Sequence, residues 1–289
     1  MPGRQAWIGK TGARLVRDQT PDPSSTIDSL PETRLSSLVL TMRCAARSPA
    51  GRADLPREDD VLRSMSSLRA SLTEVAKTIA FRHTKLGVPT YPYPNVEPIQ
   101  LATLVTEIER LKQVKGNIVE IGVASGRTTR FLCEHIVSQN LQDTLTLYAI
   151  DTFASFTKQD LEFEVKQRGK KLSELMAFGY NDFEIWKRNF ATYPFVKALQ
   201  SDCAAFDYAR VAPVKVAFLD VDLYVPTRRT LPKLYEVLVP GGVILVDDVR
   251  DNQVYDGAYQ AYMEFCQELR VAPRLVGNKC GVIFKSGAG

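Results

Sequence analysis

The sequence predicts an α/β protein built on a doubly wound, mostly parallel sheet with a helical N-terminal extension. Two observations lead to this class. The 289 residues are 45% hydrophobic and 24% charged, as in ordinary folded chains. Beyond residue 96, short runs rich in β-branched residues alternate with helical stretches, which is typical of parallel strands connected by helices. The length fits one large domain plus an appendage.

Residues 1–58 are expected to form a flexible leader rather than a core. Prolines interrupt them repeatedly, and the first seventeen residues hold four basic side chains and no acid, which accounts for much of the formal net charge of +4. Such a composition does not favour a packed core. The one regular element that we expect there is a short helix from Leu35 to Cys44.

Residues 59–96 are expected to form a helical extension and a linker. Apolar residues recur from Val61 to Phe81 in steps of four and three, which predicts a helix with one apolar stripe. That stripe either packs on the chain's own core or forms a homodimer contact. From His83 to Asn95, prolines among tyrosines predict an irregular linker that borders a pocket. The stripe residues are Val61, Met65, Leu68, Leu72, Val75 and Ile79.

The core domain, residues 97–289, opens with a helix from Ile99 to Leu111 and then alternates strands and helices. The expected strands are Asn117 to Ile121, Leu145 to Ile150, Val196 to Leu199, Val214 to Leu219, Val243 to Val246 and Val282 to Phe284. The expected helices are Thr128 to Val137, Phe183 to Tyr193, Thr227 to Val239 and Ala258 to Leu269. Ligands of such sheets bind beyond the carboxyl ends of the strands, so the residues that follow each strand are the functional candidates.

The stretch from Thr157 to Asn181 is too long for a simple connection in this fold, and lysines and arginines mix with glutamates along it. We expect either a lid or ligand-binding insertion, or a solvated surface helix. The sequence leaves both interpretations open.

The composition also bears on location and partners. Five widely spaced cysteines without a C-x-x-C pair suit a reducing compartment and buried thiols better than disulfides or a zinc site. We find no basic stripe with interleaved aromatic residues that would mark a nucleic-acid surface. Apolar runs are shorter than the ~20 residues needed to cross a bilayer, and the start lacks a secretory signal. We therefore expect a cytoplasmic protein that binds neither nucleic acid nor membrane.

The first expected strand leads into Glu120-Ile121-Gly122-Val123-Ala124-Ser125-Gly126, which opens a helix. Glycines allow a sharp turn and the close approach of a ligand, and the helix N-terminus offers free N–H groups to a carboxylate. A tight structural turn explains the same residues nearly as well. The loop is therefore a candidate binding site whose signal is weak when taken alone.

Asp151 and Asp202 follow the next two strands. An acid at the end of the second strand can accept hydrogen bonds from a ribose diol, although Asp151 can equally cap the next helix. Asp202 can accept a hydrogen bond from an adenine amino group. Polar residues at three successive strand ends favour one shared ligand site over three coincidences.

The most informative stretch is Asp220-Val221-Asp222, followed after the next strand by Asp247-Asp248. Asp220 and Asp222 alternate with an apolar residue, so both can point to one side at the strand end. Four carboxylates would then repel one another and raise their pKa values. A hard divalent cation such as Mg²⁺ relieves that repulsion and can orient a hydroxyl whose proton a spare carboxylate removes. Alternatively, the acids cap helices or pair with Arg228, Arg229 and Arg250.

Taken in order, these motifs resemble the macrocin O-methyltransferase (TylF-like) family of class I methyltransferases, over roughly residues 97–286. The resemblance implies a seven-stranded Rossmann-like sheet, S-adenosylmethionine and Mg²⁺ or a similar cation as cofactors, and methylation of a sugar hydroxyl in natural product and antibiotic biosynthesis. The matching segments are Glu120 to Gly126, Ile150-Asp151-Thr152-Phe153, Asp220-Val221-Asp222-Leu223-Tyr224, Leu238-Val239-Pro240-Gly241-Gly242 and Asp247-Asp248.

The resemblance also implies roles for the residues at matching positions. Asp220, Asp247 and Asp248 would hold the metal, and Asp222 would be the general base. The departures from the pattern, Ala124-Ser125 in the glycine loop and Val225-Pro226 after the acidic segment, concern the acceptor more than the reaction. The residues that would hold the cofactor are Glu120, Gly122, Ser125, Gly126, Asp151, Thr152, Ser155, Asp202 and Asp220.

The expected reaction is in-line methyl transfer to a hydroxyl of a glycoside, for which positioning supplies much of the acceleration. Two rivals keep the same sheet: a catechol-type O-methyltransferase that acts on a small aromatic diol, with Tyr91-Pro92-Tyr93 stacking on the ring, and a cephalosporin hydroxylase-like protein. A non-catalytic partner protein is a third. A nicotinamide-dependent oxidoreductase is disfavoured, because the third glycine of G-x-G-x-x-G and a Tyr-x-x-x-Lys pair are missing.

Overall fold

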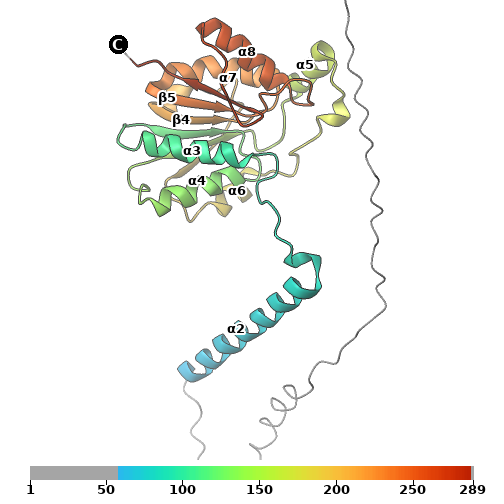
Figure 1. Ribbon diagram of the computed structural model, residues 1–289, viewed down its shortest axis with the longest axis vertical. Helices are drawn as coiled ribbons and strands as arrows, with labels where there is room; N and C mark the ends of the chain where they lie inside the picture. The colour runs from blue at the N-terminus through green and yellow to red at the C-terminus, as the bar shows by residue number, and fades with distance from the viewer. Residues whose placement is uncertain (1–57, 288–289) are drawn as a thin grey trace, which may run out of the picture. The chain divides into compact units, whose positions relative to one another are not determined.

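The computed structural model describes residues 58–287, which fall into two compact units divided after Gly87 (Figure 1). The first unit contains α2, Glu58–His83, and a short 3-10 helix, η1, Lys85–Gly87. The second unit, from Val88 onward, holds the sheet. The expected leader and its short helix from Leu35 to Cys44 lie outside the described residues. Among the helices that are described, none has the length and apolar character needed to cross a bilayer.

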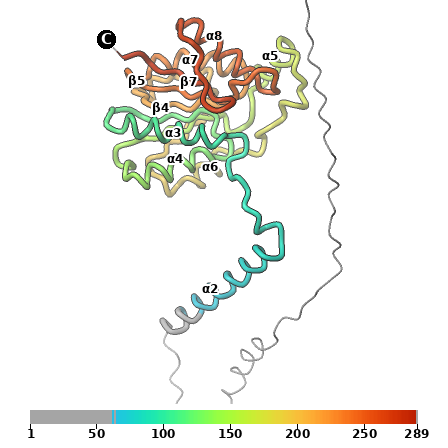
Figure 2. The backbone as a smooth tube through the Cα atoms, viewed as in Figure 1, coloured from blue at the N-terminus to red at the C-terminus, as the bar shows by residue number. Residues whose placement is uncertain are grey.

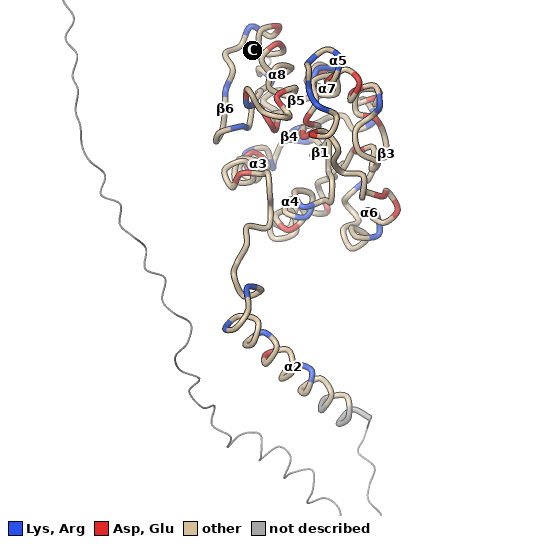
Figure 3. Tube along the Cα trace, turned by 90° about the vertical axis from the view of Figure 1, so that its right-hand side faces the viewer, with Lys and Arg blue, Asp and Glu red and all other residues tan. Residues whose placement is uncertain are grey.

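Helix α2 contains the whole segment for which the spacing of apolar residues predicts a helix, and it extends further at both ends. It carries both charge signs along its length (Figure 3), and basic residues lie in its last turn, where the helix dipole favours them. The homodimer contact expected for its apolar stripe stays a prediction. The stripe residues whose side chains are described are all exposed: Met65, Leu68, Leu72, Val75 and Ile79.

The second unit is organised around a seven-stranded sheet in the order β3-β2-β1-β4-β5-β7-β6. Strand β7 runs antiparallel to its neighbours β5 and β6, and the other neighbouring strands are parallel (Figure 2). The doubly wound, mostly parallel sheet predicted from the sequence is confirmed. The strands are β1 Asn117–Ile121, β2 Leu147–Asp151, β3 Val196–Gln200, β4 Val214–Leu219, β5 Leu238–Val246, β6 Leu275–Val276 and β7 Cys280–Phe284.

Helices cover both faces of the sheet, which is why its central strands are buried on both sides (Figure 1). One core cluster joins the sheet to α3, α4 and α6, and another joins it to α7 and α8. The four cysteines within the described range are buried free thiols, as expected. The helices are α3 Pro98–Arg110, α4 Arg127–Ser138, α5 Lys158–Arg168, α6 Phe183–Asn189, α7 Tyr224–Val237 and α8 Gly257–Leu269, with 3-10 helices η2 Leu172–Glu174 and η3 Tyr208–Val211.

Several elements differ from the expected ones: β2 begins at Leu147, β5 begins at Leu238, and the helix that starts at Phe183 ends at Asn189. The helix expected to end at Val239 ends at Val237, because the Pro-Gly-Gly segment belongs to β5, where the pairing with β4 shifts register. Strand β6 has two residues, too few for a recognisable alternation. Helix α5 is not merely a solvated surface helix, since Asp160 and Glu164 are buried.

The strand tips that flank the site end at one level. Ile121 of β1 pairs with Ile150 of β2 on one side and with Leu219 of β4 on the other, and Leu219 pairs with Val246 of β5. The chain leaves β1 toward β2 and β3 and then returns to the other side of β1 as β4. The switch point between β1 and β4 is therefore the place where a ligand is expected.

Candidate functional site

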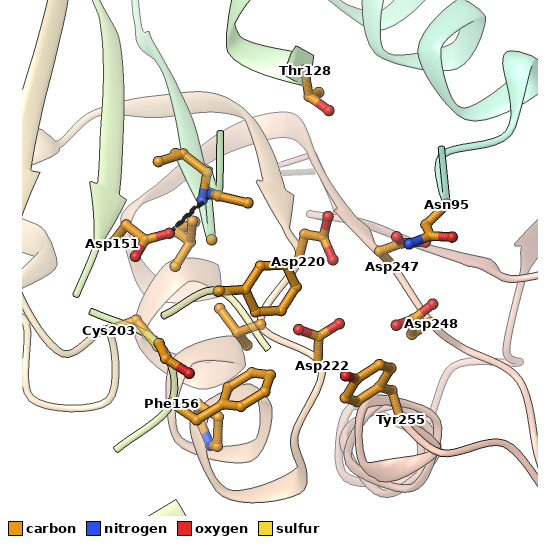
Figure 4. Close-up of a pocket in the computed structure, with 18 of the residues that line it drawn as sticks. Asn95, Thr128, Asp151, Phe156, Cys203, Asp220, Asp222, Asp247, Asp248 and Tyr255 are labelled. Atoms are coloured by element: carbon orange, nitrogen blue, oxygen red, sulfur yellow. Dashed lines mark hydrogen bonds between the residues drawn. The ribbon is translucent and has the colours of Figure 1, made fainter. Parts of the chain in front are cut away.

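A cavity of about 690 Å³ lies beyond the tips of β1, β2, β4 and β5 (Figure 4). This position at the switch point is typical of ligand sites in doubly wound sheets. Every site residue predicted from the sequence lines the cavity except Gly126. Residues 94–96 also line it, so the linker before α3 borders the pocket, as expected.

Both glycines of the loop after β1 are required by packing. Gly122 has a positive φ of 80°, and a Cβ there would lie 1.7 Å from the carbonyl oxygen of Asp220. Gly126, the residue before α4, has a φ of 83°, and a Cβ there would lie 2.5 Å from the Phe190 ring. The tight-turn interpretation therefore accounts for both positions. The lack of a side chain at Gly122 lets the loop after β1 pack directly on the segment after β4.

Glu120 is the least compensated acid at the glycine-loop end of the cavity. Its side chain is 1% exposed, and one of its carboxyl oxygens has no hydrogen-bond partner. Burial raises the pKa of Glu120 to about 8. A cationic group entering the cavity would supply the missing partner and favour the ionised carboxylate.

Asp151 and Asp202 hold the loops around them through backbone N–H groups. Asp151 accepts a hydrogen bond from Val123 N at 2.7 Å through Oδ2, drawn as a dashed line in Figure 4, and one from Phe153 N at 2.6 Å through Oδ1. Asp202 accepts one from Ala204 N at 2.8 Å. A carboxylate offers about four acceptor sites. Asp151 also accepts from Ala124 N at 3.2 Å and from Thr152 Oγ1 at 3.4 Å, so its acceptor sites are already in use. Asp202 keeps acceptor capacity for a ligand.

The side-chain hydroxyls predicted beyond β2 tie two loops together. Thr152 Oγ1 donates to the carbonyl oxygen of Ser155 at 2.6 Å. Ser155 Oγ donates to the carbonyl oxygen of Ala177, which belongs to the segment after η2. Asn181, which follows that segment, donates to Ala124 O of the glycine loop at 2.8 Å. The 158–181 insertion is thus fastened to both loops of the glycine-loop end.

The acids after β4 and β5 converge at the other end of the cavity. Asp220, Asp222 and Asp248 each place one carboxylate oxygen within 4.8 Å of the other two, and Figure 4 shows these side chains and that of Asp247 around one space. The sequence led us to expect that alternation along a strand orients Asp222, and this is wrong, because strand β4 already ends at Leu219. Asp222 is instead oriented by its left-handed backbone, with a φ of 62°.

The carboxylates at the acid end of the cavity repel one another. Burial raises the pKa of Asp220 and of Asp222 well above the ordinary value, and the charges of neighbouring aspartates raise both further. Burial and the charge of Asp248 also raise the pKa of Asp247. Each carboxylate therefore makes it harder for the others to ionise. A cation placed among them would reverse that effect.

Asp247 already has partners. Its Oδ1 accepts from Gln100 Nε2 at 2.6 Å, and its Oδ2 accepts from Lys279 Nζ at 2.9 Å. Lys279 also lies 2.7 Å from Asp248 Oδ1. Burial by itself lowers the pKa of Lys279, but the charges of Asp247 and Asp248 outweigh it and raise that pKa above its ordinary value.

Sequence reasoning did not find Lys279. The feature of the sequence that could have pointed to Lys279 is its position just before β7. That strand pairs antiparallel with β5, with Gly281 opposite Val246. The backbone N–H of Val249 also bonds to the carbonyl oxygen of Lys279 at 2.7 Å. That register sets the lysine opposite the Asp247-Asp248 pair.

An aromatic cluster lies beside the acids and was also missed. The rings of Phe156 and Phe178 meet edge to face with centroids 5.6 Å apart, and Tyr255 lies 6.1 Å from Phe156. Figure 4 shows Phe156 and Tyr255 next to Asp222. The three rings come from the loop after β2, the insertion and the loop before α8. They give the acid end of the cavity an apolar aromatic wall.

Comparisons with known proteins agree on one type of fold. The family model of macrocin-O-methyltransferase (TylF) matches residues 57–278. The structure of the O-methyltransferase NovP is 20% identical over 64% of this chain and 78% of its own, with a TM-score of 0.51. CalS11, a calicheamicin methyltransferase, is 16% identical over 83% of this chain and 99% of its own, with a TM-score of 0.50. No curated protein matches by sequence.

Proposed function

This chain belongs to the macrocin-O-methyltransferase (TylF) family, and we propose that it methylates a hydroxyl group on the sugar of a glycosylated natural product, with the help of a divalent cation. Its activity is that of an S-adenosylmethionine-dependent O-methyltransferase. The observation that carries the proposal is the convergence of Asp220, Asp222 and Asp248 in the same cavity as the glycine loop.

We assign the glycine-loop end of the cavity to S-adenosylmethionine. Glu120 would face the ammonium group of the methionine part, because one of its carboxyl oxygens lacks a partner. Asp151 would accept from the ribose in place of its long 3.4 Å contact with Thr152 Oγ1. Asp202 would accept from the adenine amino group with the acceptor sites that its bond from Ala204 N leaves free. Gly126 contributes indirectly, as the residue from which α4 starts. The other residues assigned to the cofactor are Gly122, Ser125, Thr152 and Ser155 at this end and Asp220 at the acid end.

The acid end suits a hard divalent cation such as Mg²⁺. Its donors are carboxylate oxygens, they are close together, and their charges repel one another. We propose that Asp220 and Asp248 hold the ion together with Asp247, whose oxygens contact Gln100 and Lys279 here. When bound, such an ion lowers the pKa of a neighbouring hydroxyl and orients it.

We propose Asp222 as the general base. Its side chain is 9% exposed and faces the space shared by the other acids. Burial raises the pKa of Asp222, and a base whose pKa lies nearer the working pH accepts a proton more effectively. Asp222 would take the proton of the acceptor hydroxyl, whose oxygen would bond to the methyl group; S-adenosylmethionine would supply that group and would leave as S-adenosylhomocysteine, with the electron pair of the broken carbon–sulfur bond on sulfur.

The aromatic cluster supports an acceptor that presents a ring. Phe156, Phe178 and Tyr255 would contact one face of the ring and leave a hydroxyl directed at Asp222. Tyr180 and Met176 of the insertion are largely exposed at 69% and 73%, so the outer part of a larger acceptor has apolar surface to contact. This arrangement favours a ring carried on a bulky product over a small linear alcohol.

The same rings also favour the second candidate, a catechol-type enzyme, since an aromatic diol would stack on them. Of the residues expected to stack, Tyr93 lines the cavity, whereas Tyr91 donates its hydroxyl to Val96 O at 2.9 Å. A cephalosporin hydroxylase-like protein on the same sheet would release no S-adenosylhomocysteine. The homodimer and the cytoplasmic location stay predictions.

The test is an assay of S-adenosylhomocysteine with three acceptors: macrocin, TDP-rhamnose and catechol. Each is measured with Mg²⁺ and with excess chelator, and mass spectrometry of the product identifies the methylated hydroxyl. We expect turnover of a sugar acceptor that falls at least tenfold in chelator. If only catechol is turned over, the proposed glycoside acceptor is wrong and an aromatic diol takes its place. If turnover is equal with and without chelator, the proposed role of the metal is wrong.

A further inference from the structure

Glu164 of α5 is a buried acid outside the cavity, at the meeting point of three helices. Its side chain is 1% exposed. Its Oε1 accepts from the backbone N–H of Tyr224 at 2.7 Å, and its Oε2 accepts from Arg168 Nε at 2.9 Å. The packing is close, since a Cβ at Gly257 would lie 2.9 Å from Glu164 Oε1 and 2.3 Å from Tyr224 N. Helices α5, α7 and α8 therefore converge on one carboxylate.

Glu164 supplies the N-terminal cap that α7 lacks. Helix α7 begins at Tyr224, after Leu223, whose side chain cannot accept a hydrogen bond. The first N–H groups of a helix need acceptors, and a negative charge there is favoured by the helix dipole. Glu164, sixty residues earlier in the chain, supplies both the acceptor for the Tyr224 N–H and the negative charge near the start of the helix.

The turn fastened in this way is the one that carries Asp222. Asp222 has a left-handed backbone, and Leu223 N donates to Val221 O at 2.6 Å within a tight turn. The carbonyl oxygen of Asp222 accepts from Ala258 N at the start of α8. A non-glycine residue with such a backbone persists only where its surroundings hold it. Glu164 and the start of α8 are the surroundings that hold this one.

An ionic chain extends this support to the loop that follows Asp248. Arg168 lies 2.7 Å from Asp256, and Lys170 contacts Asp256 and the carbonyl oxygen of Gln253, each at 2.7 Å. Gln253 lines the cavity, as does Tyr255. The insertion thus contacts both the turn that carries Asp222 and the loop that follows Asp248. These contacts are costly to break, because removing one partner of a buried pair leaves an uncompensated charge.

We propose that Glu164, held by Arg168, is a positioning residue that keeps Asp222 aimed at the acceptor hydroxyl; Arg168 is in turn paired with Asp256. The assignment rests on the role proposed for Asp222. The insertion would then have a function besides contact with the acceptor, since α5 sets the geometry of the acid end while lying outside the cavity.

Helix α5 contains its own matched control. Glu162 and Lys166 form a second i, i+4 pair, also 2.9 Å apart, but their side chains are 48% and 66% exposed. The helix thus presents two pairs of the same spacing and length, one buried against α7 and one in solvent. Exposed pairs of this kind contribute little. Substitutions in the two pairs separate positioning from a general effect on α5.

The experiment compares Glu164→Ala and Glu164→Gln with Glu162→Ala. Hydrogen exchange by mass spectrometry reports on residues 220–226, calorimetry gives the affinity for S-adenosylmethionine, and kcat is measured with whichever of macrocin, TDP-rhamnose or catechol is turned over. For Glu164→Ala we expect exchange at least tenfold faster and kcat at least tenfold lower, with cofactor affinity within twofold. Glu164→Gln, which keeps an acceptor for Tyr224 N–H, should lie between, and Glu162→Ala should match the wild type.

Two results would overturn the assignment: wild-type exchange and kcat in Glu164→Ala, or a fall in cofactor affinity as large as the fall in kcat, which would indicate general damage. If Glu164→Ala does not fold, Glu164→Gln carries the same comparison. Exchange requires no acceptor. A wild type that turns over none of the three acceptors therefore rejects the proposed function, while the exchange data still decide whether Glu164 holds the turn.

Discussion

The glycine-loop end of the cavity is held mainly through backbone groups, whereas the acid end is held mainly by side chains. At the first end, Gly122 packs on the carbonyl oxygen of Asp220, just beyond β4, and Asp151 accepts backbone N–H groups of the loop. At the second, Gln100, Lys279 and Glu164 reach the acid-bearing loops from α3, the start of β7 and α5.

Because of this difference, we expect mutations at the two ends of the cavity to affect different properties of the protein. Backbone packing has little tolerance for added atoms, so changes at the glycine-loop end should act mostly on stability. The carboxylates at the acid end repel one another, so removing one of them relieves repulsion, and changes there should act mostly on chemistry and ion affinity. Four experiments, from the largest expected effect to the smallest, test that division.

Substitution of the proposed base should give the largest effect. Asp222→Asn should lower kcat about 10²- to 10⁴-fold, the contribution typical of a general base, and leave calorimetric affinity for S-adenosylmethionine unchanged. Asp143→Asn, which alters an exposed acid, serves as the control. Full turnover in Asp222→Asn would remove this residue from the base role.

Adding one methyl group at the glycine-loop end should cost stability. Gly122→Ala should lower the free energy of unfolding by about 3 kcal/mol or more, because its Cβ meets the Asp220 carbonyl at 1.7 Å. Gly169 has a similar φ of 69° but nothing within 4 Å of a Cβ, so Gly169→Ala should cost only about 1 kcal/mol. Denaturant unfolding measures both, and equal losses would contradict the packing argument.

Removal of the lysine at the acid end should tighten cation binding. Lys279→Met deletes a positive charge that contacts Asp247 and Asp248, so the affinity for Mg²⁺ should rise about tenfold. Lys285→Met is the control, since Nζ of Lys285 donates to the carbonyl oxygens of Tyr235 and Glu236 rather than to the acids of the cavity. Titration calorimetry with Mg²⁺ measures both. An unchanged or weaker affinity in Lys279→Met would show that the ammonium does not compete with the ion.

The smallest effect concerns protons at Glu120. Its pKa is about 8 in the folded protein, above the ordinary 4.5, so the carboxyl is mostly protonated at neutral pH. Its stabilising contribution should be lost as the pH rises toward 8. A bound ammonium favours ionisation, so cofactor binding near pH 7 should release up to about one proton and tighten as the pH rises.

Titration calorimetry in two buffers with different ionisation enthalpies counts the protons released. Glu120→Gln should abolish the release, since the amide does not titrate. If the wild type binds the cofactor without releasing protons, Glu120 does not meet the ammonium and the assignment of this end must change.

The parallel core was predictable because its strands are short apolar runs between polar ends. Asn117–Ile121 and Val214–Leu219 were predicted with their observed bounds, since strands buried on both faces are rich in apolar residues, although each of these contains one buried charged residue, Glu120 and Lys215. The acid motif was also readable, because the tips of parallel strands gather at one edge. The part of β5 before Val243 was not, because a Pro-Gly-Gly segment ordinarily signals a turn.

By itself, the sequence determined the class of sheet, the edge at which the ligand site lies and the acids that face it, because these depend on local periodicity and on residues next to strand ends. Only the tertiary structure decided that Asp222 is oriented by a left-handed turn, that Lys279 contacts Asp247 and that Glu164 caps α7. Those features arise where segments far apart in the chain meet, and partners set by packing leave no periodic signal in either segment.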